Sequence, residues 1–474
     1  MRFSENFGID RAQAELDFVD VPLDTDIRVF IDPYAVAMMK TPWCRAAHAL
    51  ACNFFQRVLD CLRAEDRAGA LTLLSHLPED NRTRLGYSEN DPQGTGFGDV
   101  RAGPFLDALE SSEAFQTGQI EDIEDTALFV ERVGFDIVSD MMTNVLRELL
   151  IIYTQEQCAL LGIPTARRET FEAWRADTGW TRLTADLPTD GTRAIILVPR
   201  AVVRKDLSLQ PGQYLTDFLD HYYDRGNRSA IESLERMLQG RVPMKRRRKV
   251  NRTDLKEELK KKGSLKNIMA RISKDCPEAL SGYKNRAREK RPVLTPGELE
   301  SIHPQRKDDD ISGLIAEMRD AARNADDVME LARRITAGML AALHPIFQHP
   351  RLLNTQVNGF AGVLMSNTAA KGPLWNARHN GGRDERPNVV VLASSTPITE
   401  ASLGHFDPNA LRAATDSGLI VLVGPSIDKA TRVRRATHAR AGVVVMSTSE
   451  LADIAEVEAG ADVAADAFSA LMAA

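Results

Sequence analysis

Apolar residues recur along this chain at spacings typical of both helices and strands. In the first part of the chain, apolar positions at i, i+3 and i+4 predict two helices within residues 43–77 and one long amphipathic helix over residues 135–161. Short apolar runs at residues 26–36 and 193–203 each predict a strand. The first of these strands is expected to stop at Asp32-Pro33, because proline disfavours continuation of a ladder. These patterns predict an N-terminal α/β domain over residues 1–205.

The end of the chain, residues 311–474, shows a long helical pattern followed by alternating strands and helices. Residues 312–347 have helical spacing with one break. Four apolar runs predict strands, at residues 359–367, 388–395, 418–425 and 442–448. Strands that alternate with helices imply a largely parallel sheet whose faces are covered. We therefore expect a second, C-terminal α/β domain.

Between these two domains, residues 206–310 predict a basic helical segment and a linker. Residues 214–240 have helical periodicity, and residues 288–310 combine proline with dense charge, as linkers do. The chain carries a net charge of −7, but residues 200–306 hold 26 Lys and Arg against 14 Asp and Glu, a balance of +12. The remainder then sums to −19, so a basic block stands inside an acidic protein.

The basic block is densest between Arg241 and Lys266, with 12 basic and 3 acidic residues. On a helix such a run presents charge nearly all round, and it repels itself unless water or a polyanion neutralises it. Phosphate backbones do so and release counterions, which gives salt-dependent and mainly sequence-independent affinity. A solvated arm without a partner is the alternative. The candidate nucleic-acid contacts are Lys245, Arg246, Arg247, Arg248, Lys249, Arg252, Lys260, Lys261, Lys262 and Lys266; Lys256 belongs to the same basic run.

Composition limits the other function classes. Aromatic residues make up 6% of the chain, which argues against a stacking platform for single strands. No apolar run is long enough to span a bilayer, and the N-terminus lacks a hydrophobic signal core, so a cytoplasmic protein without a membrane partner is expected. Five scattered cysteines indicate reduced thiols. Cys44, His48 and Cys52 share a helix face, but without a fourth ligand they favour core packing over zinc.

Two further segments have candidate chemistry. Glycines 94, 96 and 98 precede a predicted helix, but GxGxG matches no phosphate-binding pattern, so a packed tight turn is favoured. An acidic cluster could hold Mg²⁺ or Ca²⁺, although capping of a helix start and a solvated face are the favoured interpretations. The cluster contains Glu121, Asp122, Glu124, Asp125, Asp136 and Asp140.

The C-terminal order of helix, strand, "VLMSNTAAKG", strand, helix and strand resembles the core of restriction-endonuclease-like proteins, the PD-(D/E)xK superfamily. More narrowly, the chain resembles bacterial phage-defence proteins that join such a core to an N-terminal domain. The N-terminal phrases that carry this likeness are "VFIDPYAV", "GTGFGDVRAGPFLDAL", "FDIVSDMMTNVLRELLIIYTQEQCALLGIP" and "IILVPRAVVR".

That resemblance implies a metal-dependent nuclease site, with an Asp on one strand and Glu-x-Lys on the next. Two carboxylates then hold the metal that activates water, and the lysine adds positive charge. In this sequence the Asp position of the motif falls near Gly362, the Glu position on Leu392 and the Lys position on Ser394. An upstream acid would fall near Asn354 or Gln356, so the motif is degenerate. A generic α/β domain that never was a nuclease is the alternative.

The sequence leads to three functional hypotheses. The first is a DNA-binding protein of a bacterial anti-phage defence system with a catalytically degenerate nuclease-like C-terminal domain, needing no cofactor, and docking to DNA or to a partner protein that supplies catalysis. The second is an active Mg²⁺-dependent endonuclease with relocated acids, for which Asp384, Glu385, Glu400, Asp407 and Asp428 are nearby. The third is a non-enzymatic interaction scaffold. The balance leans away from an enzyme.

Overall fold

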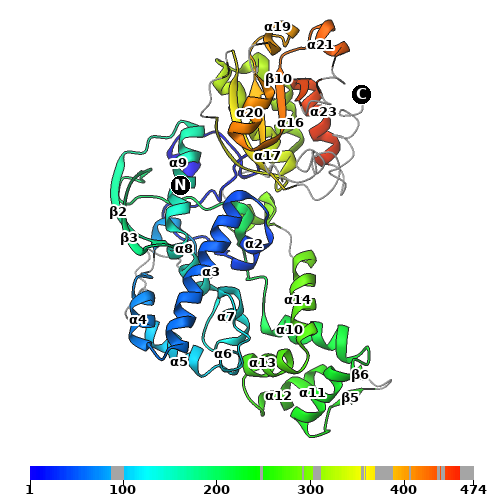
Figure 1. Cartoon of the computed structure of the whole chain (residues 1–474). Helices are drawn as coiled ribbons and strands as arrows, with labels where there is room; N and C mark the ends of the chain where they lie inside the picture. The colour runs from blue at the N-terminus through cyan, green and yellow to red at the C-terminus, as the bar shows by residue number, and fades with distance from the viewer. Residues whose placement is uncertain are drawn as a thin grey trace.

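The protein is described by a computed structural model, in which three regions follow one another along the chain (Figure 1). We call residues 1–205 the body, residues 206–302 the helical lobe and residues 311–459 the C-terminal lobe. The structure describes residues 1–78, 80–86, 101–245, 249–290, 293–302, 311–353, 357, 359–368, 388–404, 407–434, 438 and 443–459.

The body is mostly helical. Its first elements are α1 (Phe3–Asn6), η1 (Gln13–Glu15), β1 (Phe30–Ile31), α2 (Pro33–Met38), α3 (Pro42–Arg63), α4 (Arg67–Ser75) and η2 (Asn81–Thr83). These are followed by α5 (Ala102–Glu110), α6 (Glu113–Gln116), α7 (Ile123–Phe129), α8 (Phe135–Val145), α9 (Arg147–Leu161), β2 (Arg167–Arg175), β3 (Gly179–Leu187), η4 (Arg200–Val202) and β4 (Val203–Arg204).

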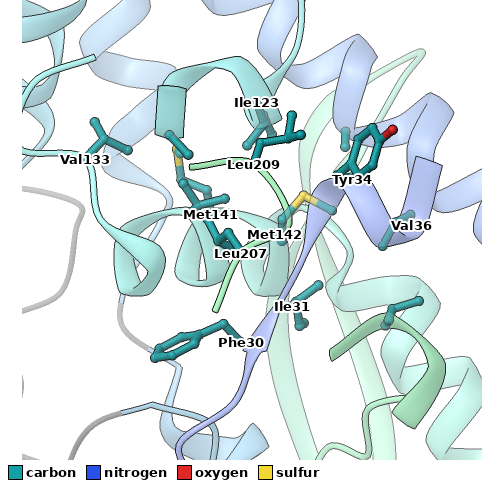
Figure 2. Packing of buried hydrophobic residues seen from close by; sticks show 14 of the residues in the cluster. Phe30, Ile31, Tyr34, Val36, Ile123, Val133, Met141, Met142, Leu207 and Leu209 are labelled. Carbon is teal, nitrogen blue, oxygen red and sulfur yellow. The ribbon is translucent and has the colours of Figure 1, made fainter. Parts of the chain in front are cut away.

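The helical lobe extends from the body, and the hairpin β5–β6 lies at its outer edge (Figure 1). Its elements are α10 (Pro211–Phe218), η5 (Leu219–Tyr223), α11 (Arg228–Leu238), β5 (Met244–Lys245), β6 (Lys249–Val250), α12 (Arg252–Lys260), α13 (Leu265–Asp275), α14 (Pro277–Lys290) and α15 (Pro296–Ile302). One hydrophobic cluster runs through the body and this lobe. Figure 2 shows part of it, where β1 and α8 pack with Leu207 and Leu209.

The C-terminal lobe is built on a five-stranded sheet in the order β11-β10-β9-β8-β7. Its helices are α16 (Ile311–Asn324), α17 (Val328–Leu343), α19 (Glu400–Leu403), α20 (Pro408–Thr415), α21 (Lys429–Val433) and α23 (Thr448–Ala459). Its strands are β7 (Phe347–Leu352), β8 (Ala361–Asn367), β9 (Asn388–Ala393), β10 (Ser417–Gly424) and β11 (Val443–Ser447).

Each face of this sheet has its own apolar cluster, because successive strand residues point to opposite sides. Val363, Val391 and Val421 pack on the face with α16, α17 and α23. Leu364, Leu392 and Leu422 pack on the other face with Leu411 of α20 and Ile398. The expectation of an α/β sheet with covered faces is therefore confirmed.

Strand direction corrects the expectation of a largely parallel sheet. β9, β10 and β11 are parallel, whereas β7 pairs antiparallel with β8 and β8 antiparallel with β9. All four predicted strands are present. The fifth, β7, has the sequence FQHPRL, in which His, Pro and Arg interrupt the apolar pattern. The sequence of β7 alone does not predict a strand, and its pairing with β8 is what stabilises the extended conformation.

The body differs from expectation at three places. Residues 194–198 are buried but form no ladder, because Ile195, Ile196 and Leu197 donate their amides to three separate segments. The long helix is two helices, α8 and α9, that meet at Leu146. The hairpin β2–β3, with nine residues in each strand, was missed, since its charged residues alternate with few apolar ones. The two helices within residues 43–77 are confirmed as α3 and α4.

A glycine in α17 provides a test of how the C-terminal lobe is packed. A Cβ at Gly338 would stand 2.5 Å from Met318 Sδ and 2.7 Å from Met318 Cβ, in α16. Gly-to-Ala in a helix gains about 1 kcal/mol in propensity, but overpacking a core costs about 1–3 kcal/mol. We expect G338A to lower the melting temperature measured by calorimetry.

The matched control is G103A in α5, where an added Cβ meets nothing within 4 Å. That substitution gains helix propensity without a clash, so its melting temperature should be unchanged or higher. Equal stabilisation by both substitutions would contradict the close contact between α16 and α17.

Candidate nucleic-acid interface

The densest part of the basic run lies on a hairpin rather than on a helix. Met244–Lys245 pairs antiparallel with Lys249–Val250, and Lys245 stands directly opposite Lys249 in the ladder. The three arginines between them, Arg246, Arg247 and Arg248, lie outside the described residues.

Helix α12 separates its charges, which corrects the expectation of basic charge all round. Arg252, Lys256 and Lys260 follow one another at a spacing of four residues, so they form a row along one side of the helix. Asp254 and Glu258 fall on a different side, whereas Glu257 lies next to Lys260, three residues away. Leu255 and Leu259 are buried against the lobe. We call the row of Arg252, Lys256 and Lys260 the basic stripe.

The members of the stripe differ in their contacts. Lys256 and Lys260 are exposed, while Arg252 is half-buried and donates to Asp220 of η5. Lys256 and Lys260 are a like-charge pair one turn apart, which costs helix stability in isolation. The stripe therefore keeps two exposed ammonium groups together.

The other lysines of the run lie elsewhere. Lys261 is paired with Glu258, with 2.6 Å between Nζ and Oε1, and Lys262 is exposed beyond the end of α12. Lys266, on α13, points inward and donates to the carbonyl oxygens of Val130 and Val133 at 2.7 and 2.8 Å. Lys266 thus fastens the helical lobe to the body, and that contact occupies its ammonium group.

The positions expected to carry nuclease chemistry come together on one face of the C-terminal sheet. Gly362 of β8 is directly opposite Leu392 of β9, and Ser394 follows two residues after Leu392. A Cβ at Gly362 would stand 2.6 Å from Leu353 Cδ2 and 3.1 Å from Leu392 Cδ2. Leucine side chains therefore fill the space where two carboxylates would hold a metal. Ser394 is buried and donates to the carbonyl of Thr396 at 2.9 Å.

The acids near this face have structural roles. Asp407 accepts from the amide of Asn409 at the start of α20, and Asp428 accepts from the amide of Thr431 at the start of α21. Glu400 pairs with His438 at 3.1 Å and with Arg434 at 3.4 Å. Asn354, Gln356, Asp384 and Glu385 lie outside the described residues.

The acidic cluster of the body is held by a lysine. Lys284 Nζ, from α14, is 2.9 Å from Glu124 Oε1 and 2.8 Å from Asp125 Oδ1. Burial raises the pKa of Glu124 to about 7, although Lys284 opposes that shift. Asp125 also accepts from the amide of Asp122, as expected for capping at a helix start. This cluster therefore links α7 to the helical lobe.

The remaining candidates bring no metal set together. Cys52 Sγ lies 3.6 Å from the ring of His48, whereas Cys44 is fully buried, and burial raises the pKa of both thiols to about 12. Asp136 faces Arg101 at 3.8 Å. The loop of Gly94, Gly96 and Gly98 lies outside the described residues. Among the residues that the structure describes, no group of three His, Cys, Asp or Glu could hold a metal ion.

One polar cluster was not found from the sequence, and it lies where the body meets the C-terminal lobe. Asp17 Oδ2 accepts from the hydroxyl of Tyr153 at 2.8 Å and from the backbone amide of His349 at 3.1 Å. Arg200 donates to the carbonyl oxygens of Ala14 and Leu340. His344 Nε2 stands 4.0 Å from Asp17 Oδ1. We call Asp17, Tyr153, Arg200, His344 and His349 the polar joint.

Comparison with known proteins gives one partial match. A family model described as a domain of unknown function, DUF8370, matches residues 8–210. That range covers the body and the first residues of the helical lobe. No curated protein matches the chain, and no solved structure matches it either. No helix within the described ranges is both long and apolar enough to cross a membrane.

The position of Lys266 predicts a pH dependence of stability. Burial lowers the pKa of its ammonium group to about 8, against the opposing effect of Glu131. The unfolded chain then binds more protons than the folded protein between pH 8 and about 10.4, the ordinary lysine pKa, so stability rises with pH across that window.

From pH 8 to pH 10, the unfolding free energy of wild type should rise by about 1–3 kcal/mol relative to that of K266M. Urea denaturation at each pH measures it. K274M serves as the control, since Lys274 is an exposed lysine near the end of the same helix. A pH-independent difference for K266M would show that Lys266 is not buried at the joint of α13 with the body.

The filling of the Gly362 position gives a second prediction. G362A should cost about 1–3 kcal/mol through overpacking against Leu353. Removing the obstructing side chain should relieve that clash, so L353A/G362A should be at least about 1 kcal/mol more stable than the sum of the single changes predicts. Chemical denaturation measures this coupling. Simple additivity would indicate open space at Gly362.

Proposed function

We propose that this chain is a DNA-binding protein of a bacterial anti-phage defence system, with a nuclease-like C-terminal lobe that does not cut. The observation that supports DNA binding most directly is the basic stripe on α12. It holds two exposed lysines, Lys256 and Lys260, one turn apart on the same side of the helix. Two like charges at this spacing are unfavourable in the isolated helix and become favourable against a row of phosphates.

The chemistry of the lobe favours contact with the phosphate backbone over contact with bases. No Phe, Trp or Tyr occurs between Asp224 and Gly282, so neither the hairpin nor α12 carries a ring on which an unpaired base could stack. Asp254 and Glu258 of α12 stand on another side of the helix and would repel phosphates there. An approach along the basic stripe, with affinity governed by salt, follows from this arrangement.

The arrangement of the C-terminal lobe is compatible with the resemblance that suggested a nuclease. A helix, α17, precedes the antiparallel strands β7, β8 and β9, and α20 then leads to β10 beside β9. The order from α17 through β8, β9 and α20 to β10 is compatible with the order on which the resemblance rests, and β7 is an additional strand between α17 and β8. Leu353 and Leu392 close over Gly362, which supports a core kept for its shape rather than for catalysis.

Substitution of the stripe tests the proposal directly. K256A/K260A should weaken binding of a labelled DNA duplex in fluorescence anisotropy. Because each lysine that contacts a phosphate contributes about one unit to the slope of log K against log salt, the double variant should reduce that slope by about two.

The matched control is K261A, on the same helix. Lys261 is paired with Glu258 on the acidic side, so its loss should leave affinity and salt slope nearly unchanged. A loss in K261A half as large as that in K256A/K260A would mean that only net charge matters. Unchanged binding in K256A/K260A, or no binding by wild type at low salt, would refute the stripe as the DNA contact and favour an interaction scaffold.

A further inference from the structure

The polar joint is a buried polar contact between two regions that have separate apolar cores. The clusters of the C-terminal lobe contain residues from Ile315 onward, and Leu160 of α9 is the one described body residue in them. Polar contacts make up much of the remaining connection: Gln157 donates to the carbonyl of Pro350 at 2.8 Å, and Arg333 to that of Leu160 at 2.7 Å. Loss of these contacts would separate the lobe without opening either core.

Two histidines stand at the centre of this joint, and the nearest described acceptor for an added proton is Asp17 Oδ1, which lies 4.0 Å from His344 Nε2, beyond hydrogen-bond distance. His344 is almost fully buried, and His349 is 7% exposed. Within the described part of the chain, His344 Nε2 and both ring nitrogens of His349 are buried and have no hydrogen-bond partner. A charged imidazole in such a place is costly, because burial without hydrogen bonds removes its hydration.

Burial and the charged groups around each ring determine the direction in which its pKa shifts. His344 faces the Asp17 carboxylate, but also Arg200 of η4, Arg204 of β4 and His349. Burial and these cations lower the pKa of His344 well below its ordinary value.

His349 is enclosed by Trp43 of α3, Tyr153 of α9 and the neighbouring Arg351, with Asp17 as the nearby anion. Burial lowers its pKa as well, with Asp17 opposing and Arg351 adding to the shift. Asp17 is the one carboxylate close to both rings in the described contacts. Its Oδ2 accepts from Tyr153 and from the His349 amide, whereas its buried Oδ1 has no hydrogen-bond partner among the described residues.

We propose that the polar joint is an acid-sensitive latch, in which proton uptake by His344 and His349 releases the C-terminal lobe from the body. In the open state the rings meet water and regain an ordinary pKa near 6.5. The closed state is therefore fully favoured above that pH and loses stability as the pH falls below it.

Hydrogen–deuterium exchange of the full chain between pH 7.5 and 5.0, corrected for intrinsic rates, tests this proposal. The amides of β7 and of η1 should exchange faster below pH 6.5, by up to about tenfold per pH unit for each histidine that takes up a proton. The amides of α3 and α8, inside the core of the body, should stay protected. The radius of gyration from small-angle scattering should increase over the same pH range.

The variant H344Q/H349Q should abolish the acid acceleration, whereas H76Q/H438Q, which removes two histidines outside the joint, should keep it. If the first variant does not fold, H349Q alone should halve the dependence of log rate on pH. Acid acceleration that is equal in wild type and in H344Q/H349Q or H349Q would overturn the proposal. So would a closed wild type at pH 5, or loss of protection in α3 and α8 in parallel with β7.

Discussion

The buried carboxylate of Asp17 connects three segments that are distant in the sequence. This carboxylate accepts from the hydroxyl of Tyr153 in α9 and from the amide of His349 in β7. The backbone carbonyl of Asp17 accepts from the amide of Arg200. Arg200 in turn donates to Leu340 at the end of α17. The position of the C-terminal sheet relative to the body depends on this group, because the two regions share little apolar core. A buried charge in such a position needs every one of its partners.

The helical lobe is attached to the body by a different means. It shares one continuous hydrophobic cluster with the body, and two lysines of the lobe reach the body across this contact, Lys266 at the end of α7 and Lys284 at its beginning. The region that carries the basic stripe is therefore held to the body by an apolar core, whereas the C-terminal sheet is held through polar groups. This difference is compatible with the proposed function, in which one region binds DNA and the other changes position.

Much of this fold was visible in the sequence, because helices and central strands carry their own periodicity. The four apolar strands of the C-terminal lobe and the helices α3, α4, α16 and α17 follow from spacing alone. Strand direction did not, since it depends on connections rather than on residues. The basic run was found, but its division into a hairpin and a one-sided stripe required the break before Arg252. The polar joint was invisible, because Asp17, Tyr153 and His349 meet only through the tertiary fold.

We propose that this protein contacts the phosphate backbone of DNA and does not cut the DNA. The most direct measurement follows one supercoiled plasmid by gel electrophoresis, with the protein, Mg²⁺ and a series of salt concentrations. The account predicts retardation at low salt that disappears as salt rises, with the plasmid recovered intact after the protein is removed. Nicked or linear plasmid whose appearance EDTA abolishes would contradict it, and so would a plasmid that is never retarded.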